Sequence, residues 1–397
     1  MKILQINSVC GIRSTGRICT DIAEILEREG HDCKIAFGRL ECPEKYQRFA
    51  MPFGGNASVL PHMLSAVALD NAGFLSRRAT KTLIQKIREF SPDVIHLHNV
   101  HGFYVNIELL FDYLKECGIP VVWTLHDCWS FTGHCAYFDY AKCEKWKAGC
   151  HSCPQKLDYP QSYLLDRSKQ NYKRKKELFT SLKNLTLVTP SQWLADRVAQ
   201  SYLKDASCRV IHNGIDLSVF RPVCMDVHEK FGIPKDKKIV LGVASVWEAR
   251  KGLPDFLTLA ELLDDGYQVV LVGLSPKQIQ ALPQKVIGIS RTNNTEELAA
   301  LYSAATVLVN PTYDDNYPTV NLEAQACGTP VITYRTGGSV ESVPAEHVVD
   351  AGNVEGLKQA ILTLRDTEEA CLERAKSFDK TQKYYEYLRL YEEIVKQ

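Results

Sequence analysis

The sequence predicts an α/β protein built from two Rossmann-like halves. The chain has 397 residues, more than one hydrophobic core usually serves, so two domains are expected. Strand-like apolar runs alternate with amphipathic helical runs in both halves, an order typical of doubly wound parallel sheets. A segment with Asn-Gly and Arg-Pro pairs, 209-RVIHNGIDLSVFRP-222, separates the two series. We therefore expect a first domain over residues 1–205, a linker over 206–222 and a second domain over 223–378.

The first half opens with the strand MKILQIN, a loop, and a helical run that Gly30 stops. HDCKIAFG is the next predicted strand, and buried strands follow at residues 93–99, 120–127 and 185–191. Ligands of parallel α/β sheets bind beyond the carboxyl ends of the strands. The polar residues that follow these strands are therefore candidates for a site.

The second half repeats this pattern. Strands are predicted at residues 237–245, 267–273 and 306–311, with helices at 255–266 and 295–305 between them. An aromatic-rich amphipathic helix is predicted at the end of the chain, within residues 379–397.

Composition excludes several classes of protein. The 47 basic and 47 acidic residues cancel, which argues against a general nucleic-acid footprint, so no nucleic-acid partner is expected. The start, MKILQINSVCG, turns polar too soon for a signal peptide, and no apolar run reaches the ~20 residues of a spanning helix. We expect a cytoplasmic protein.

The stretch 313-YDDNYPTVNLEAQACGTPVIT-333 carries the most chemistry. Pro318 suits a first helical position, and Gly328 suits the turn after the helix. Free N–H groups between Tyr317 and Val320 would then form an anion site suited to a diphosphate. Glu323, about one turn further on, could accept hydrogen bonds from two vicinal hydroxyls, such as those of a ribose. An ordinary connection between a strand and a helix would give a similar string, so both interpretations stay open at this point.

The string DNYPTVNLEAQACGTPVI resembles the signature of retaining glycosyltransferases of family GT4. Their pattern is an acidic residue, seven residues, Glu, small residues and then CG-x-PV. The resemblance extends over nearly the whole chain. It implies the GT-B fold, in which two Rossmann-like domains face each other across a cleft. The N-terminal domain would bind the acceptor and the C-terminal domain an NDP-sugar, with the helix at 379–397 crossing back to the N-terminal domain.

The same resemblance implies the reaction. A sugar would move from a nucleotide-diphosphate sugar, a UDP- or GDP-sugar, with retention of configuration and without a catalytic cofactor. The string TLHDCWSFTGHC is similar to enzymes of bacterial surface polysaccharides of the colanic-acid type. This implies a glycan or an undecaprenyl-linked glycan as the acceptor.

The resemblance assigns catalytic roles to three residues. Lys251 takes the position that holds the donor diphosphate, His126 that of an active-site histidine near the donor sugar, and Asp315 that of the acid facing the sugar. Ser245 stands where the family often has Arg, and Arg250 is expected to compensate. Donor contacts are expected from Gly16, Arg250, Arg291, Asn316, Tyr317, Thr319, Val320 and Glu323.

Gly16 lies in the loop 11-GIRSTGRI-18, where it is expected to open a helix and let backbone approach the donor. The string HLHNVHG holds two alternating histidines, His96 and His98, which point the same way from a strand. We expect packing and hydrogen-bonding roles for both. His98, Asn99 and His101 are placed on the acceptor side of the site.

Four cysteines gather in an insertion at residues 128–160: Cys135, Cys143, Cys150 and Cys153. In a reducing compartment such a cluster suggests metal before disulfides. Four thiols can close a tetrahedral structural zinc site. Zinc and reduced buried thiols are equally open, and either would serve as scaffolding for the acceptor loop.

The basic run KRKKELF (173–179) predicts a solvated helix face, or a contact with an anionic membrane surface that would make the enzyme a peripheral membrane protein. Two other functions also stay open. One is a non-hydrolysing NDP-sugar epimerase, and the other a non-catalytic nucleotide-sugar-binding protein.

Overall fold

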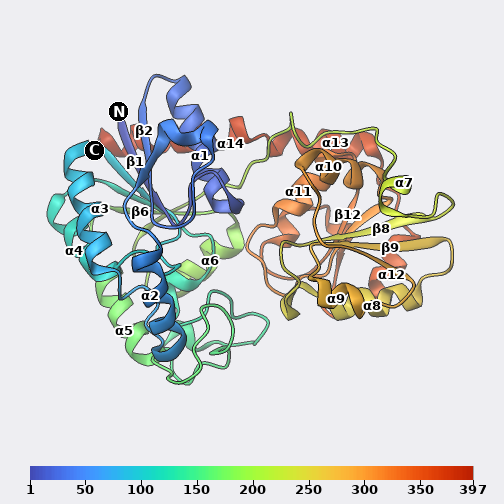
Figure 1. Ribbon diagram of the computed structural model, residues 1–397, viewed down its shortest axis with the longest axis horizontal. Helices are drawn as coiled ribbons and strands as arrows, with labels where there is room; N and C mark the ends of the chain where they lie inside the picture. Colours follow the sequence, from blue (N-terminus) through green and yellow to red (C-terminus); the bar gives the residue numbers. More distant parts are fainter. Residues whose placement is uncertain (397) are drawn as a thin grey trace. The chain divides into compact units, whose positions relative to one another are not determined.

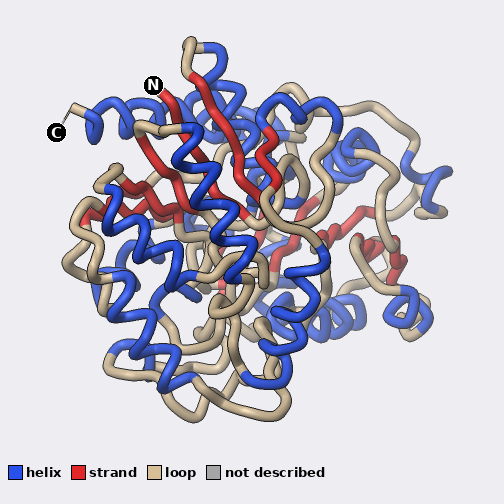
Figure 2. Tube along the Cα trace, turned by 60° about the vertical axis from the view of Figure 1, so that its left-hand side comes forward, coloured by secondary structure: helices blue, strands red, loops and turns tan. Residues whose placement is uncertain are grey.

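The computed structural model describes residues 1–396 and divides the chain into two compact units. Unit 1 holds Met1–His212 together with the residues from Tyr384 onward, and unit 2 holds Asn213–Lys383. Each unit contains one parallel sheet with helices packed on it (Figures 1 and 2). The first division therefore falls inside the segment predicted to be a linker, residues 206–222.

The sheet of unit 1 has seven parallel strands in the order β3-β2-β1-β4-β5-β6-β7. In chain order they are β1 Lys2–Asn7, β2 Asp32–Phe37, β3 Ala50–Pro52, β4 Val94–Leu97, β5 Val121–Thr124, β6 Leu185–Thr189 and β7 Ser207–Val210. The prediction of a linker was wrong for β7, which pairs with β6 and closes one edge of the sheet. Its half-exposed, alternating residues lack the apolar signal of the central strands.

The crossover helices of unit 1 are α1 Arg13–Arg28, α2 Asn56–Leu69, α3 Arg77–Phe90, α4 Ile107–Cys117, α5 Ser168–Phe179 and α6 Gln192–Gln200. Side chains mark some of their ends. Asn106 and Ser191 accept from Leu109 N and Leu194 N and so cap α4 and α6. Gly118 ends α4 in the left-handed conformation.

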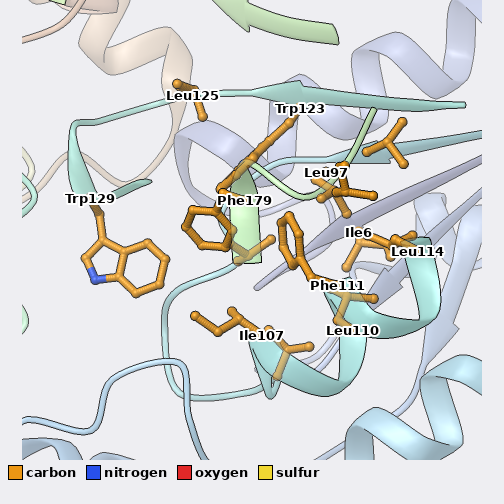
Figure 3. Packing of buried hydrophobic residues seen from close by; sticks show 14 of the residues in the cluster. Ile6, Leu97, Ile107, Leu110, Phe111, Leu114, Trp123, Leu125, Trp129 and Phe179 are labelled. Atoms are coloured by element: carbon orange, nitrogen blue, oxygen red, sulfur yellow. The ribbon is translucent and has the colours of Figure 1, made fainter. Parts of the chain in front are cut away.

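An aromatic core lies beneath the strands of unit 1 (Figure 3). Phe111 from α4 and Phe179 from α5 contact Trp123 of β5, with ring centroids 5.5 and 4.8 Å from it. Trp129, in the insertion at 128–160, joins the same core, as do the insertion residues Phe131, Phe138 and Trp146. The insertion is therefore packed into unit 1 through its aromatic side chains.

Unit 2 has six strands in the order β10-β9-β8-β11-β12-β13. They are β8 Lys238–Val243, β9 Tyr267–Val272, β10 Val286–Ile289, β11 Val307–Asn310, β12 Val331–Tyr334 and β13 Val348–Val349. The helices are α7 Val227–Phe231, α8 Leu253–Leu262, α9 Pro276–Gln280, α10 Thr295–Ala304, α11 Thr319–Ala326, α12 Val354–Leu362 and α13 Glu368–Ala375. The strands predicted at 237–245, 267–273 and 306–311 are β8, β9 and β11.

The last helix, α14 (Lys380–Val395), ends in unit 1, and Figure 1 shows it in red beside the blue elements of that unit. Its Tyr384, Tyr387 and Tyr391 are buried in the core around α1 and β1. The hydroxyl of Tyr391 lies 2.6 Å from His96 Nδ1, and that of Tyr387 lies 3.0 Å from Thr124 Oγ1. No helix within residues 1–396 is long and apolar enough to cross a membrane.

Candidate functional site

In unit 2, the candidate site forms where β11 ends and α11 begins. Pro318 was predicted as the first helical residue, but it is the N-cap of α11; the helix begins one position later, and Thr319 and Val320 form its first turn. Pro318 has no N–H, so the orphan donors of this end belong to the residues that follow. Gly328 follows the helix at φ +85°, the left-handed turn expected of it.

Buried amides hold α11 in place. Asn321 Oδ1 accepts from Asn310 Nδ2 at 2.8 Å, and its Nδ2 donates to Ser342 Oγ at 2.9 Å. Gln325 donates to the Ser342 carbonyl at 2.7 Å and accepts from Arg374 at 3.0 Å. Because these groups are buried and mutually satisfied, they fix the direction in which the helix start points.

Lys251 and Asp315 form an ion pair at the same place. Lys251 Nζ lies 2.5 Å from Asp315 Oδ2, and the two side chains are only 20% and 14% exposed. Burial raises the pKa of Asp315, but the charges of Lys251 and Arg250 outweigh it and hold that pKa below its ordinary value. Arg250 also donates to the carbonyl of Asp314 at 2.8 Å. Lys251 and Arg250 thus lie together at the loop before α11, each paired with a carboxylate, Asp315 and Glu248.

Glu323 is fixed from outside the predicted motif. Its Oε2 accepts a 2.9 Å hydrogen bond from the hydroxyl of Tyr302, on α10. Burial raises the pKa of Tyr302 well above its ordinary value, so this phenol stays a hydrogen-bond donor. The bond orients one carboxylate oxygen of Glu323 on the first turns of α11.

Two glycines let the backbone of the site pack closely. Gly252 has φ +74°, and a Cβ there would lie 2.3 Å from the Pro311 carbonyl oxygen. Gly337 has φ +54°, and a Cβ there would lie 1.9 Å from the Asp315 carbonyl oxygen. Any larger residue would push the Lys251 loop or the 336–338 loop away from the start of α11.

In unit 1, the predicted histidines gather at the carboxyl ends of β4 and β5, with His96 inside β4 and His98 and His126 just beyond the strand ends. His98 Nδ1 lies 3.0 Å from His126 Nε2, and the two rings are nearly parallel. His98 Nε2 lies 3.0 Å from Gln5 Oε1 of β1. His96 bonds Thr124 and Tyr391. The packing and hydrogen-bonding roles expected of His96 and His98 are therefore confirmed.

One detail of the prediction needs correction. His98 was placed on the acceptor side, but it is 1% exposed and both its ring nitrogens are engaged by protein groups. Its ring therefore lies behind His126, which is partly exposed. His98 supports the site from within.

His101 and Asn99 lie on the loop that follows β4. His101 Nε2 is 2.9 Å from Asp127 Oδ2, and Nδ1 is 3.0 Å from the Tyr159 hydroxyl. Burial raises the pKa of Asp127, but His101 and the Trp129 N–H bring it below its ordinary value. Asn99 is tied by its backbone to Asn7 Oδ1, at 3.3 Å.

Gly16 and Arg291 were also predicted to contact the donor. Gly16 does not open its helix, because α1 already begins at Arg13 and Gly16 is buried in its first turns. A Cβ added at Gly16 would lie 3.0 Å from a side-chain carbon of Val9. Arg13 itself starts the helix at φ +56°. Arg291 is exposed on the loop after β10.

The four clustered cysteines all line one small pocket, together with His134 and His151. Hydrogen bonding from the Cys135 thiol lowers the pKa of Cys153 to about 7. Within residues 1–396, however, no group of three or more His, Cys, Asp or Glu side chains is arranged to hold a metal ion. The zinc hypothesis stays a prediction, beside the reduced thiols.

The basic run on α5 presents less charge than its sequence indicates. Arg174 pairs with Glu108 at 2.6 Å and stacks on Phe74, and Lys175 is buried over the ring of Trp129. Lys173 and Lys176 are left on the exposed face.

Sequence reasoning missed Gln5, Tyr302 and Asp127, which hold His98, Glu323 and His101. A signal existed for Gln5, because it is a polar residue in the middle of the buried strand KILQIN. Tyr302 gave no signal, since an aromatic residue on an amphipathic helix is usually core.

Two family models match the chain. Residues 15–219, just over half of its length, match Glycosyltransferase Family 4. Residues 226–383 match Glycosyl transferases group 1.

Curated relatives match over part of their length. A protein of Escherichia coli assigned to colanic acid biosynthesis as a glycosyl transferase, WcaC, is 29% identical over 64% of this chain and 62% of its own. The D-inositol 3-phosphate glycosyltransferase of Mycolicibacterium smegmatis is 32% identical over 42% of each chain. The chain thus spans less than two thirds of either relative.

Solved structures are similar over the whole chain. Sucrose-phosphate synthase of Thermosynechococcus elongatus has a TM-score of 0.72 at 17% identity, covering 99% of this chain and 98% of its own. Anabaena Alr3699/HepE, solved in complex with UDP, has a TM-score of 0.67 at 16% identity, covering 98% and 99%. At such identity the likeness shows the fold, and the predicted GT-B fold is confirmed.

Proposed function

Because the chain belongs to glycosyltransferase family 4, we propose that it transfers a sugar from a nucleotide-diphosphate sugar to a glycan acceptor in polysaccharide biosynthesis. The donor is a UDP- or GDP-sugar. The transfer retains the anomeric configuration and requires no catalytic cofactor. The acceptor is a glycan or an undecaprenyl-linked glycan. The likeness to a colanic acid glycosyl transferase and to a protein solved with UDP supports this proposal.

The observation that carries the proposal is the Lys251 ammonium at the start of α11. A diphosphate leaving group gains negative charge as the glycosidic bond breaks. The ammonium, the N–H groups at Thr319 and Val320 and the helix dipole would stabilise that charge in a partly buried setting. Glu323, held by Tyr302, would accept from the hydroxyls of a ribose.

In this proposal Asp315 and Lys251 act together. The carboxylate holds the ammonium against the loop before α11. A bound diphosphate would take over part of that contact, and the carboxylate could then meet a hydroxyl of the donor sugar. Arg250, which donates to the Asp314 carbonyl, would keep this loop in place and supply the positive charge that Ser245 lacks.

Unit 1 would supply the acceptor side through Asn99 and His101, and His126 near the donor sugar. A front-face route needs no covalent protein nucleophile, since the leaving phosphate itself can take the acceptor proton. His126 would then bind a substrate hydroxyl. The Asp127–His101 pair would support the neighbouring loop.

An undecaprenyl-linked acceptor requires approach to a membrane, and unit 1 offers an apolar face for it. Helix α2 contains no charged residue, and its Leu60 and Leu64 are 52% and 58% exposed. Leu164, at 71%, lies on a loop whose Tyr163 N–H donates to the Val67 carbonyl of α2. We propose that this face, with Lys173 and Lys176 of the basic run, contacts an anionic bilayer.

A thermal-shift panel of UDP- and GDP-sugars tests the proposal. One donor should raise the unfolding midpoint of the wild type, and Glu323→Ala should remove most of the rise. Glu261→Ala, which changes an exposed glutamate on α8, is the matched control and should respond as wild type. If no nucleotide sugar stabilises the wild type, or if Glu323→Ala responds fully, the assignment of the donor site is refuted.

A further inference from the structure

Gln5 is a polar side chain in the middle of a buried strand. It is fully buried in β1, and its amide nitrogen donates to the Cys19 carbonyl at 2.8 Å. A carbonyl can only accept, so this contact fixes which end of the amide is nitrogen. The amide oxygen Oε1 must therefore be the end that faces His98, 3.0 Å from its Nε2.

Only one tautomer of His98 can form a hydrogen bond with Gln5. Oε1 offers lone pairs alone, so Nε2 of His98 must carry a proton. Burial, helped by His96 and His126, lowers the pKa of His98 well below its ordinary value, so the ring is neutral. A neutral ring has one N–H, and Nδ1 of His98 is left with a lone pair.

The same reasoning passes to His126. Its Nε2 lies 3.0 Å from the lone pair of His98 Nδ1 and must donate there. Burial lowers the pKa of His126 to about 4, with Asp127 opposing and His101 adding to the effect. His126 is therefore neutral near pH 7, and its Nδ1 is an acceptor. Within residues 1–396, the bond to His98 is the one hydrogen bond that this ring makes.

We propose that Gln5 and His98 are positioning residues that hold His126 in the Nε2–H tautomer, so that its Nδ1 accepts a hydrogen bond from a substrate hydroxyl. The identity of that substrate as a sugar rests on the proposed function, whereas the tautomer does not. A lone pair at this point accepts a hydroxyl and repels a carboxylate. The site therefore takes a neutral sugar and disfavours a uronic acid in this position.

Nitrogen NMR of protein labelled with ¹⁵N-histidine reads the tautomer directly. Long-range proton–nitrogen correlations at neutral pH separate the two tautomers from each other and from the charged ring. The His126 signals are identified by their loss in His126→Gln. We expect a protonated Nε2 and an unprotonated Nδ1. A protonated Nδ1 in the wild type, in either a neutral or a charged ring, overturns the proposal.

Gln5→Leu tests the origin of the tautomer. Without Oε1, His98 can carry its proton on Nδ1 and donate to His126, which reverses the His126 ring. The reversed tautomer should appear, and kcat/KM with the stabilising donor should fall about tenfold, because the sugar hydroxyl would then have to turn and accept from Nδ1–H instead of donating to its lone pair. A Gln5→Leu protein with the wild-type His126 spectrum overturns the proposal.

Cys33→Ala is the matched control, because it removes the sulfur that Gln5 Nε2 meets at 3.4 Å and leaves Oε1 untouched. Its His126 spectrum should match the wild type, and kcat/KM should change by less than about twofold. If Gln5→Leu does not fold, the wild-type and Cys33→Ala spectra still decide between the tautomers. The expected tautomer without turnover of any sugar donor would support the positioning role and refute the proposed function.

Discussion

Lys251→Ala should weaken nucleotide binding strongly. The Lys251 side chain is 20% exposed, beside the Asp315 side chain at 14%, so little water screens the ion pair. A hydrogen bond between an ammonium and a phosphate oxygen contributes roughly 1.5–3 kcal/mol. This corresponds to about a tenfold to about a 150-fold increase in Kd. The variant also leaves the buried Asp315 carboxylate unpaired beside the diphosphate, which places the expected loss toward the upper end of that range.

The assay is calorimetric titration with UDP and with GDP, using whichever binds the wild type more tightly. In the double variant Lys251→Ala/Asp315→Asn the repulsion is also gone, so its Kd should fall between those of the wild type and the single variant. Lys285→Ala, an exposed lysine that approaches Glu261 at 4.0 Å, is the control and should bind as wild type. If Lys251→Ala binds like Lys285→Ala, the ammonium does not meet the diphosphate and the site is wrongly placed.

Four further changes test other parts of the structure. Gly252→Ala should lower the free energy of unfolding by about 2 kcal/mol or more in urea, because its Cβ would meet the Pro311 carbonyl, whereas Gly118→Ala, which meets nothing within 4 Å, should cost less. Burial lowers the pKa of Lys175 to about 7 from about 10.4 in the unfolded chain, so the wild type loses stability as pH falls through this range. The free energy of unfolding of Lys175→Met should therefore exceed that of the wild type by roughly 2–4 kcal/mol near pH 7 and by progressively less toward pH 10. A difference that does not change with pH would contradict this. Leu64→Glu/Leu164→Glu should lower sedimentation with vesicles containing phosphatidylglycerol, relative to Leu40→Glu, a leucine elsewhere on unit 1 that is 50% exposed. For the cysteine cluster, structural zinc predicts about one metal per chain that Cys150→Ser/Cys153→Ser releases, whereas reduced thiols predict none, which mass spectrometry of the metal content distinguishes.

The alternation of buried strands and helices predicted the two Rossmann-like units, because central parallel strands are continuous apolar runs. β8, β9 and β11 follow that pattern. The edge strands β3 and β7 were not predicted, because one face of each meets solvent and their residues are a mixture of polar and apolar types. β3 pairs with β2 and β7 with β6, each the preceding strand in the chain, but strands of three and four mixed residues leave no periodic signal.

The donor motif could be predicted because its parts are close in sequence: Asp315, Pro318, Glu323 and Gly328 lie on one loop and one helix. The contacts that hold it come from elsewhere. Tyr302 reaches Glu323 from α10, and Gln5 reaches His98 across 93 positions of sequence. Only the folded sheet brings such residues together, and His98 was accordingly predicted as an acceptor contact when it lies behind His126.

Slow hydrolysis of the preferred donor without acceptor, followed by proton NMR, tests the central claim most directly. A retaining glycosyltransferase first releases free sugar with the anomeric configuration that it had in the donor, together with the nucleoside diphosphate, and Lys251→Ala should slow this release. Initial release of the opposite anomer would contradict retention. An epimerised sugar nucleotide, or no reaction of any donor that stabilises the protein, would contradict the proposed transferase activity.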